Sequence, residues 1–218
     1  MSLLCLKGFS SEKEPQLRIS YIEHPSVQQT ALPLVKLAYK NAGIDAKFIR
    51  LPDFRFVNEI HHENIDGDVV QIDFIIDKHS ELKRVGPPIS EVEFLLICSK
   101  RVECKKTVLG DKDIAIVTTD IGRRAIKTLF PQAANNRYFI VNHLGRMPKI
   151  LATGHADYAF YIVSSSWSRP AELTSLQQIT LFKSKAYHIL HQRHEELAKR
   201  IAPEIEALLA NPPSELKF

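Results

Sequence analysis

Long apolar runs and the common catalytic motifs are missing from this sequence. No apolar run approaches the roughly 18–20 residues that a membrane-spanning helix needs. Gly-x-Ser-x-Gly, Gly-x-Gly-x-x-Gly and the Walker A loop are absent, which removes the usual hydrolase and nucleotide-binding signatures. We find no repeat at the periods typical of solenoids and no helix-turn-helix. These absences argue against a membrane span, a solenoid and a motif-bearing enzyme.

The chain also has only a small excess of charge of one sign. The 29 Lys and Arg residues and 25 Asp and Glu residues leave a formal net charge of +4. The basic residues are scattered, whereas a nucleic-acid-binding protein usually presents a continuous basic face. We therefore expect no nucleic-acid partner. A hydrophobic content of 44% with 25% charged residues is typical of a globular domain, and 218 residues allow one large domain or two small ones.

Cysteine is limited to three residues, so one thiol is unpaired in any disulfide scheme within a monomer. Cys98 and Cys104 could bridge in an oxidising compartment, but two thiols are the interpretation that we favour. Their spacing matches no zinc motif. The opening residues 1–6 are too short for a secretory hydrophobic region and lack a basic start. Either the protein is cytosolic, or a signal peptide has been removed.

The nine histidines do not form a convincing metal site. His188, His191 and His194 recur every third residue on a helix that we predict from about residue 185 to 210. Metal-binding histidines on a helix usually lie four residues apart, with a further ligand nearby. We therefore expect surface and packing histidines, and neither a metal ion nor a cofactor.

The first 75 residues predict a β-α-β-α-β unit with a parallel sheet. The expected strands cover residues 17–22, 46–50 and 69–72. Ser26 can cap the first helix, which Pro33 would kink, and Asp53 can cap the second.

A second α/β unit follows the polar stretch 100–110. Strands are expected at residues 113–117, 136–141 and 157–162, with a helix that opens at Thr118 and Thr119. A strand that leads into a helix N-terminus points free backbone N–H groups at whatever lies above the sheet. This arrangement predicts a ligand-binding edge.

Two crossings connect the units. Residues 93–98 form a strand that leads away from the first unit, and a strand near residues 178–182 leads back, while residues 84–89 interrupt the pattern. We predict a two-lobed α/β clamp, each lobe a mostly parallel sheet flanked by helices. Lobe one spans 1–97 plus 184–218, and lobe two spans 98–183. Ligands bind at the carboxyl ends of such strands, and hinged crossings let the cleft close.

In the order and spacing of five segments, the chain resembles the type II periplasmic binding fold of the extracellular solute-binding proteins of family 3, in a divergent, compact bacterial subgroup. The resemblance covers about residues 17–209. The matching segments are residues 51–55, 64–68, 82–89, 151–157 and 187–197.

The resemblance implies that the protein binds a small polar solute, amino-acid-like or a small carboxylate, for ABC-type transport. It implies a periplasmic monomer that is not an enzyme and that works with a membrane permease. The alternative is a sensory input module that signals to a membrane partner. A cleft enzyme is a further alternative, with Glu23 and His24 as its titratable pair.

Amino-acid carriers of this family hold the ligand carboxylate with an arginine and the amino group with an aspartate. The matching positions here are Lys78 and Ile162, so both of the usual anchors differ.

The candidate ligand-binding residues each have a structural alternative. Thr118 and Thr119 could donate hydrogen bonds to a ligand or simply cap the helix. Arg55 could pair a carboxylate, or form an ion pair with Asp53 or Glu59.

Four further candidates complete the predicted site. Tyr21 and Glu23 end the first strand, and Asp73 follows the third strand as an acidic wall residue. Lys78 would add positive charge from lobe one. Trp167, the only tryptophan, lies in a polar loop and could serve as a stacking surface or a docking point.

Overall fold

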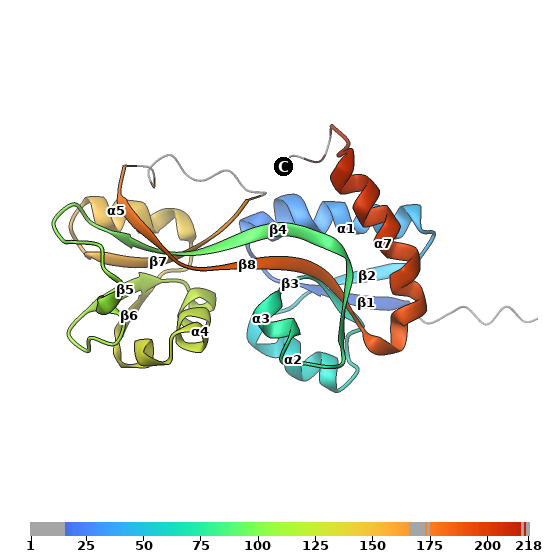
Figure 1. Ribbon diagram of the computed structural model, residues 1–218, viewed down its shortest axis with the longest axis horizontal. Coiled ribbons are helices and arrows are strands. Elements are labelled where there is room, and N and C mark those ends of the chain that lie inside the picture. Colours follow the sequence, from blue (N-terminus) through green and yellow to red (C-terminus); the bar gives the residue numbers. More distant parts are fainter. Residues whose placement is uncertain (1–15, 166–172, 174, 215, 217–218) are drawn as a thin grey trace, which may run out of the picture.

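A single mixed sheet extends through the described part of the protein. The computed structural model describes residues 16–165, 173, 175–214 and 216. The strand order is β2-β1-β3-β8-β4-β7-β5-β6 (Figure 1). The strands are β1 (Leu17–Tyr21), β2 (Ala46–Arg50), β3 (Gly67–Ile72), β4 (Leu82–Cys98), β5 (Ala115–Thr118), β6 (Arg137–Ile140), β7 (Tyr158–Ser164) and β8 (Gln177–His191). The helices are α1 (Leu32–Asn41), α2 (Asp53–His61), α3 (Asp73–Ile76), α4 (Asp120–Leu129), α5 (Met147–Ala152) and α7 (Glu195–Ala210).

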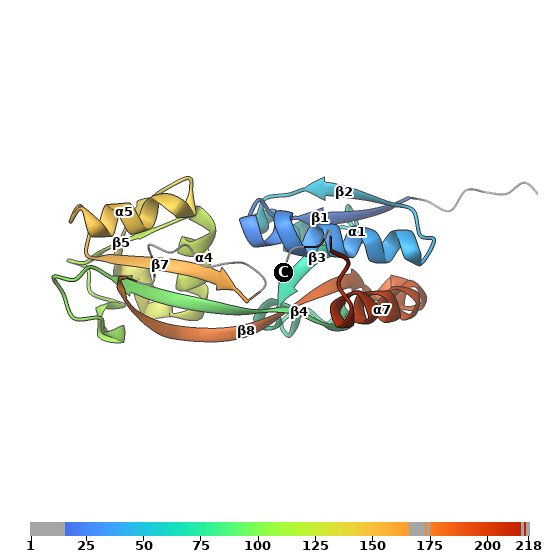
Figure 2. The ribbon, with the colours of Figure 1, turned by 90° about the horizontal axis from the view of Figure 1, so that it is seen from above.

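The two longest strands, β4 and β8, connect the two ends of this sheet. They pair antiparallel from Leu82 opposite His191 to Cys98 opposite Gln177. Parallel pairs of β1 with β2 and β3 lie beyond β8, and parallel pairs of β5 with β6 and β7 lie beyond β4. Figure 2 shows β4 and β8 running between the two groups of elements. We call β1–β3 with α1, α2, α3 and α7 the β1 end, and β5–β7 with α4 and α5 the β5 end.

Helices bury both faces of the sheet at the β1 end. On one face, α1 and α7 enclose a core that includes Leu34 and Ile201, both fully buried. On the other face, Phe56 and Ile60 of α2 pack against Ile189 of β8. A strand covered on both faces contains apolar residues at successive positions, as parallel-sheet proteins usually show.

The β5 end has the same two-sided arrangement. Ile126 of α4 belongs to a cluster with Phe94 and Phe160 of the sheet. Met147 of α5 belongs to a separate cluster with Tyr161. The core is therefore divided between the two ends, with β4 and β8 passing from one to the other.

The β-α-β-α-β order that the first 75 residues predict is confirmed. The helix after β1 begins with a π-helical turn over Val27–Ala31, and α1 follows. Pro33 stands at the start of α1 rather than in its interior, and Ser26 makes no side-chain capping bond. The predicted lobe boundaries at 97/98 and 183/184 stay a prediction, because β8 continues through the second of them.

The prediction of a last helix from residue 185 is wrong. β8 continues to His191, and α7 begins at Glu195. Ile189 and Leu190 are both fully buried, in clusters on opposite faces of the sheet. The strand therefore lacks the alternation of apolar and polar residues that distinguishes a strand from a helix. His188 lies in this strand and is fully buried, so the three histidines do not share a helix.

The predicted break at residues 84–89 is also wrong, since these residues belong to β4. The pairing of β4 with β8 skips from Val85 to Ser90, and Pro87 and Pro88 fall within that gap. Proline has no N–H group to donate to a neighbouring strand, so an irregular, unpaired position is where a strand accepts it.

Cys98 and Cys104 form a disulfide, where we expected two thiols. Cys98 ends β4, and the Cα atoms of the two residues are 5.5 Å apart, within the usual range for a bridge. A disulfide of this kind persists in an oxidising compartment.

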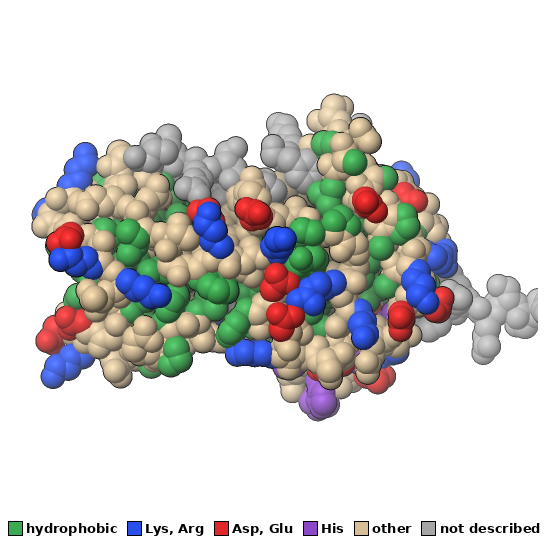
Figure 3. Space-filling model, in the orientation of Figure 1, with side chains coloured by type: hydrophobic (Ala, Val, Ile, Leu, Met, Phe, Trp, Pro, Cys, Tyr) green, Lys and Arg blue, Asp and Glu red, His purple; other side chains and the backbone are tan. Residues whose placement is uncertain are grey.

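The outer surface shows no gathering of charge on the face drawn in Figure 3, where basic and acidic side chains are intermixed. No helix in the described ranges has both the length and the apolar character that crossing a membrane would take.

A buried polar chain links α1, β3 and β8 inside the β1 end. His188 Nδ1 donates to the Asp68 backbone carbonyl at 2.7 Å, and Tyr39 Oη lies 3.0 Å from His188 Nε2. Because the carbonyl can only accept, the proton of a neutral His188 is on Nδ1, and Tyr39 donates to Nε2. Burial lowers the pKa of His188 to about 4 and raises the pKa of Asp68 to about 8. At neutral pH this interior therefore favours uncharged forms of both groups.

These pKa shifts predict a stability maximum near pH 6.5. The unfolded chain ionises Asp68 above about pH 4, whereas the folded protein keeps it protonated to about pH 8, so stability falls as pH rises across that window. Buried His24 and His188, both with pKa values lowered to about 4, have the opposite effect below pH 6.5. Below pH 6.5 the effect of the two histidines on stability exceeds the effect of Asp68, so stability falls as the pH falls toward 4.

Asp68→Asn should remove the loss of stability at alkaline pH. We expect the free energy of unfolding of the variant to exceed that of the native protein by ~2 kcal/mol or more at pH 8, at about 1.4 kcal/mol per pKa unit. The two free energies should approach each other near pH 4. Urea unfolding at several pH values measures this, with exposed Asp113 changed to Asn as the control. A variant that keeps the alkaline decline would contradict the buried, protonated carboxyl.

Candidate functional site

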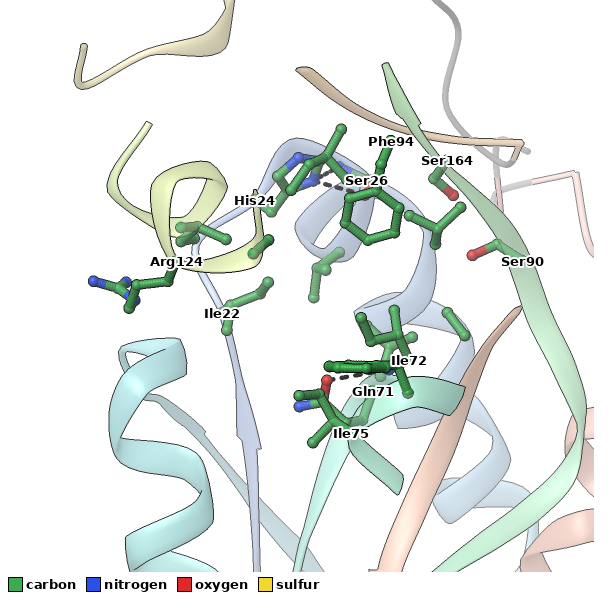
Figure 4. A pocket seen from close by; sticks show the side chains of 18 of the residues that line it. Ile22, His24, Ser26, Gln71, Ile72, Ile75, Ser90, Phe94, Arg124 and Ser164 are labelled. Carbon is green, nitrogen blue, oxygen red and sulfur yellow. Dashed lines mark hydrogen bonds between the residues drawn. The ribbon is translucent and has the colours of Figure 1, made fainter. Parts of the chain in front are cut away.

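A cavity of about 220 Å³ opens between the β1 end and the β5 end. The β1 end supplies Ile22 and His24 after β1, with residues of β3 and α3. The β5 end supplies residues of α4 and the last three residues of β7. Figure 4 shows side chains from both ends converging on this space, with Ser90 and Phe94 of β4 beside it. The cavity therefore lies where a clamp made of these two ends would hold a ligand.

The walls of this cavity are largely apolar. Seventeen of the 24 lining residues that the structure describes have apolar side chains, and both ends contribute to them. They are Ile22, Val27, Ala31, Phe56, Val57, Val70, Ile72, Phe74, Ile75, Val92, Phe94, Ile121, Ala125, Leu129, Ile162, Val163 and Ala186.

His24 and Ser26 form a polar corner of the cavity. His24 Nδ1 accepts from the Ser26 backbone N–H at 3.3 Å and lies 2.7 Å from Ser26 Oγ. The backbone carbonyl of His24 accepts from Val27 and Gln28, so the His24 backbone forms part of the first turn of the helix. Burial lowers the pKa of His24 to about 4. The ring is thus neutral at neutral pH.

Four more uncharged hydrogen-bonding side chains occur among the described lining residues: Gln71 of β3, Ser90 of β4, Thr128 of α4 and Ser164 of β7. Figure 4 places Ser90 and Ser164 on the same side of the space, with Gln71 near its floor in that view. Gln71 Oε1 accepts from the backbone N–H of Ile72 at 3.1 Å, which holds the amide against β3.

Arg124 is the cation among the described lining residues. Its guanidinium forms an ion pair with Asp120 and stacks on Phe54 of α2, with Cζ 5.0 Å from the ring centroid. Figure 4 shows the guanidinium extending away from the middle of the cavity, so the aliphatic stem faces inward. Arginine commonly buries its stem and keeps its head at the surface. Because Arg124 belongs to the β5 end and Phe54 to the β1 end, this contact also bridges the two.

Thr119 is the N-cap of α4, as predicted, whereas Thr118 is the last residue of β5, and neither lines the cavity. The Thr118 hydroxyl is buried and donates to the Phe160 carbonyl at 2.9 Å. The Thr119 hydroxyl accepts from the Gly122 N–H at 3.1 Å and caps the helix. A Cβ on Gly122 would lie 2.1 Å from Thr118 Oγ1, so glycine lets α4 pack closely on β5.

Three candidates from the β1 end also lie outside the cavity lining. Arg55 pairs with Glu59 along α2, the structural alternative for this residue. Glu23 pairs with Arg50 at 3.0 Å, with both side chains mostly exposed. Tyr21 packs against the core shared by α1 and α7.

Asp73 and Lys78 flank α3 without lining the cavity. Asp73 Oδ1 accepts from Arg84 at 2.8 Å, and Lys78 Nζ lies 3.9 Å from the centroid of the Phe74 ring. Trp167 lies outside the described residues. The ligand-binding roles of the eight candidates stay predictions.

The cavity adds residues that the sequence reasoning did not select. Gln71, Ser90, Arg124 and Ser164 come from four different elements, and their meeting depends on how β4 and β8 connect the two ends. Arg124 carried one readable signal, its position four residues after Asp120 in a helix. In the described ranges, no group of three His, Cys, Asp or Glu residues is arranged to hold a metal ion.

Comparison with known proteins identifies the fold. No family model and no curated protein sequence matches the chain. Solved structures do. The ligand-binding core of GluR0 from Nostoc punctiforme, in complex with L-glutamate, has a TM-score of 0.63 at 13% identity and covers 89% of this chain and 93% of its own. A protein assigned as the binding component of an ABC transporter from Wolinella succinogenes, complexed with lysine, has a TM-score of 0.63 at 13% identity and covers 91% of both chains.

A third similar structure is the ancestral amino acid-binding protein AncCDT-1, described as a precursor of cyclohexadienyl dehydratase. Its TM-score is 0.63 at 10% identity, with 90% of each chain covered. The predicted two-lobed α/β architecture is confirmed by these likenesses, which extend over nearly the whole chain. The protein has the fold of the type II periplasmic binding proteins.

Proposed function

We propose that the protein is a solute receptor that binds one small molecule in the cavity between the β1 end and the β5 end. The observation that carries the proposal is the position of the cavity, which both ends of the sheet line. The similar structures described with bound glutamate and lysine support the proposal by sharing the fold. Fold alone does not establish function, so the cavity itself bears the argument.

Binding of the solute would drive closure of the two ends. A ligand that touches both ends has more contacts in a closed state than in an open one, and this difference shifts the population toward closure. The stacking of Arg124 on Phe54 would add to the closed state, because its partners come from opposite ends. Bending along β4 and β8 would permit the motion.

Delivery to an ABC-type permease is the role that we propose for the bound form. A likeness to a transporter-binding component supports it, and the Cys98–Cys104 disulfide supports a periplasmic or other oxidising location. A sensory module would use the same closure, read by a different membrane partner. It would bind solute equally well and would differ in the partner that it captures.

A cleft enzyme is the less supported alternative. Glu23 pairs with Arg50 at the exposed surface, and His24 is hydrogen-bonded to Ser26. The Glu23 and His24 side chains thus have separate partners, which does not favour an acid–base pair between them.

A thermal-shift screen tests the proposed function. The library should contain amino acids, polyamines, carboxylates, sugars, and uncharged aromatic and aliphatic compounds. A binder at a hundredfold excess over its Kd stabilises the folded protein by ~2.7 kcal/mol, which gives a clear rise in Tm. If no compound raises the Tm, and none binds in titration calorimetry, the receptor proposal is contradicted.

Phe54→Ala tests closure with any compound that the screen identifies. Phe54 does not line the cavity and is 62% exposed, so the change removes its contact with Arg124 without altering the cavity lining. A cation–π contact at an exposed site contributes about 0.5–1 kcal/mol, and we expect affinity to fall about two- to fivefold. Phe139→Ala, at a side chain 59% exposed on β6, is the matched control. Equal affinities of the two variants would contradict a closed state bridged by this contact.

A further inference from the structure

We propose that the ligand of this cavity is an uncharged, mainly apolar small molecule with one or two hydrogen-bonding groups. The inference rests on the proposed function, because it names the ligand class of that same site. The structures described with glutamate and lysine share the fold, yet the interior of this cavity favours a different kind of ligand.

The described lining of the cavity lacks an acidic partner for a cationic ligand. No Asp, Glu or Lys occurs among the described residues that line the cavity. An α-ammonium group buried there would meet no carboxylate from the described lining residues, and an unpaired buried charge is strongly unfavourable. A free amino acid, a polyamine or another organic cation is therefore poorly matched to this space.

Arg124 carries the one permanent charge among the lining residues that the structure describes. Arg124 directs its guanidinium to Asp120 and to the face of Phe54 rather than toward the middle of the cavity. An entering carboxylate would have to compete with both partners and turn the side chain inward. His24 provides no second cation, since burial holds its pKa near 4. The interior thus presents little net charge to a ligand at neutral pH.

A ligand in this cavity would cover apolar surface from both ends. Ile75 and Phe74 of α3 face the same space as Phe94 of β4 and Ile121 of α4. A ligand with an apolar body would remove these surfaces from water together with its own, which is the dominant favourable contribution in such sites. Both ends supply apolar walls, so the same contacts would favour closure.

Polar side chains in the lining favour a ligand that is not a plain hydrocarbon. Ser90 and Ser164 lie on one side of the cavity, and Gln71 lies near α3. Hydroxyl and amide groups suit a neutral donor or acceptor such as an amide, alcohol or ketone. These groups would orient the ligand without requiring it to carry a charge.

A matched series of ligands tests the inference. Phenylpropanamide, phenylpropanoate, phenethylamine and phenylalanine have similar aromatic bodies with neutral, anionic, cationic and zwitterionic heads. Their affinities are measured at pH 7 by calorimetry, and by displacement of the uncharged fluorescent probe N-phenylnaphthylamine. We expect the probe to bind and the amide to bind at least about tenfold more tightly than each charged compound, because the charged heads lose hydration without gaining a partner.

Each alternative result overturns the inference. A carboxylate that binds as tightly as the amide would mean that Arg124 turns inward to pair with it. Tighter binding of phenylalanine or phenethylamine would mean that an acidic partner reaches the ligand. If the probe and the amide do not bind while a polar compound from the wider screen does, the ligand class is wrong and the receptor proposal stands. If no compound of the matched series or of the wider screen binds, the proposed function is contradicted as well.

A pair of variants places the binding in the cavity. Ile75→Ser replaces a partly buried lining residue with a polar one, and we expect probe and amide affinity to fall about tenfold, in line with burial of one aliphatic side chain. Ile179→Ser is the matched control, because Ile179 is also partly buried but does not line the cavity. Equal loss in both variants, or no loss in Ile75→Ser, would show that the apolar compounds bind elsewhere.

Discussion

The antiparallel pairing of β4 with β8 is the constraint on which the rest of the structure depends. These two strands pass from the β1 end to the β5 end and carry the sheet across the middle of the described chain. Each end has its own buried clusters on both faces, so each is held together by its own packing. A connection made of two strands fixes the direction of the ends while leaving a cavity between them.

The chemistry of that cavity is set by side chains rather than by the fold. The described lining combines a neutral histidine, an arginine that faces outward, a few hydroxyl and amide groups, and many aliphatic and aromatic residues. Similar folds described with glutamate or lysine show that the architecture accommodates charged ligands. The difference proposed for this protein arises because the described lining contains no Asp, Glu or Lys and its arginine faces outward.

The sequence predicted the architecture better than the site. The strands and helices of the first 75 residues follow ordinary periodicity, and they were predicted correctly. Residues 185–191 were misread as helix because burial on both faces of β8 removes alternation, and residues 84–89 of β4 were misread as a break because a bulge accommodates the prolines there. The strands predicted near residues 178–182 and at residues 93–98 lie within β8 and β4. Thr119 caps a helix and Arg55 pairs with Glu59, local roles that sequence reasoning allowed. The lining residues could not be selected in advance, since they come from elements that only the long β4–β8 pairing brings together.

Hydrogen exchange with and without the tightest-binding compound tests the central claim most directly. Exchange of each peptide is followed by mass spectrometry. We predict slower exchange in residues 70–76 of the β1 end and in residues 120–129 of the β5 end, because one ligand between them would order both. Protection confined to a single end, or to segments distant from the cavity such as β6, would contradict binding between the two ends.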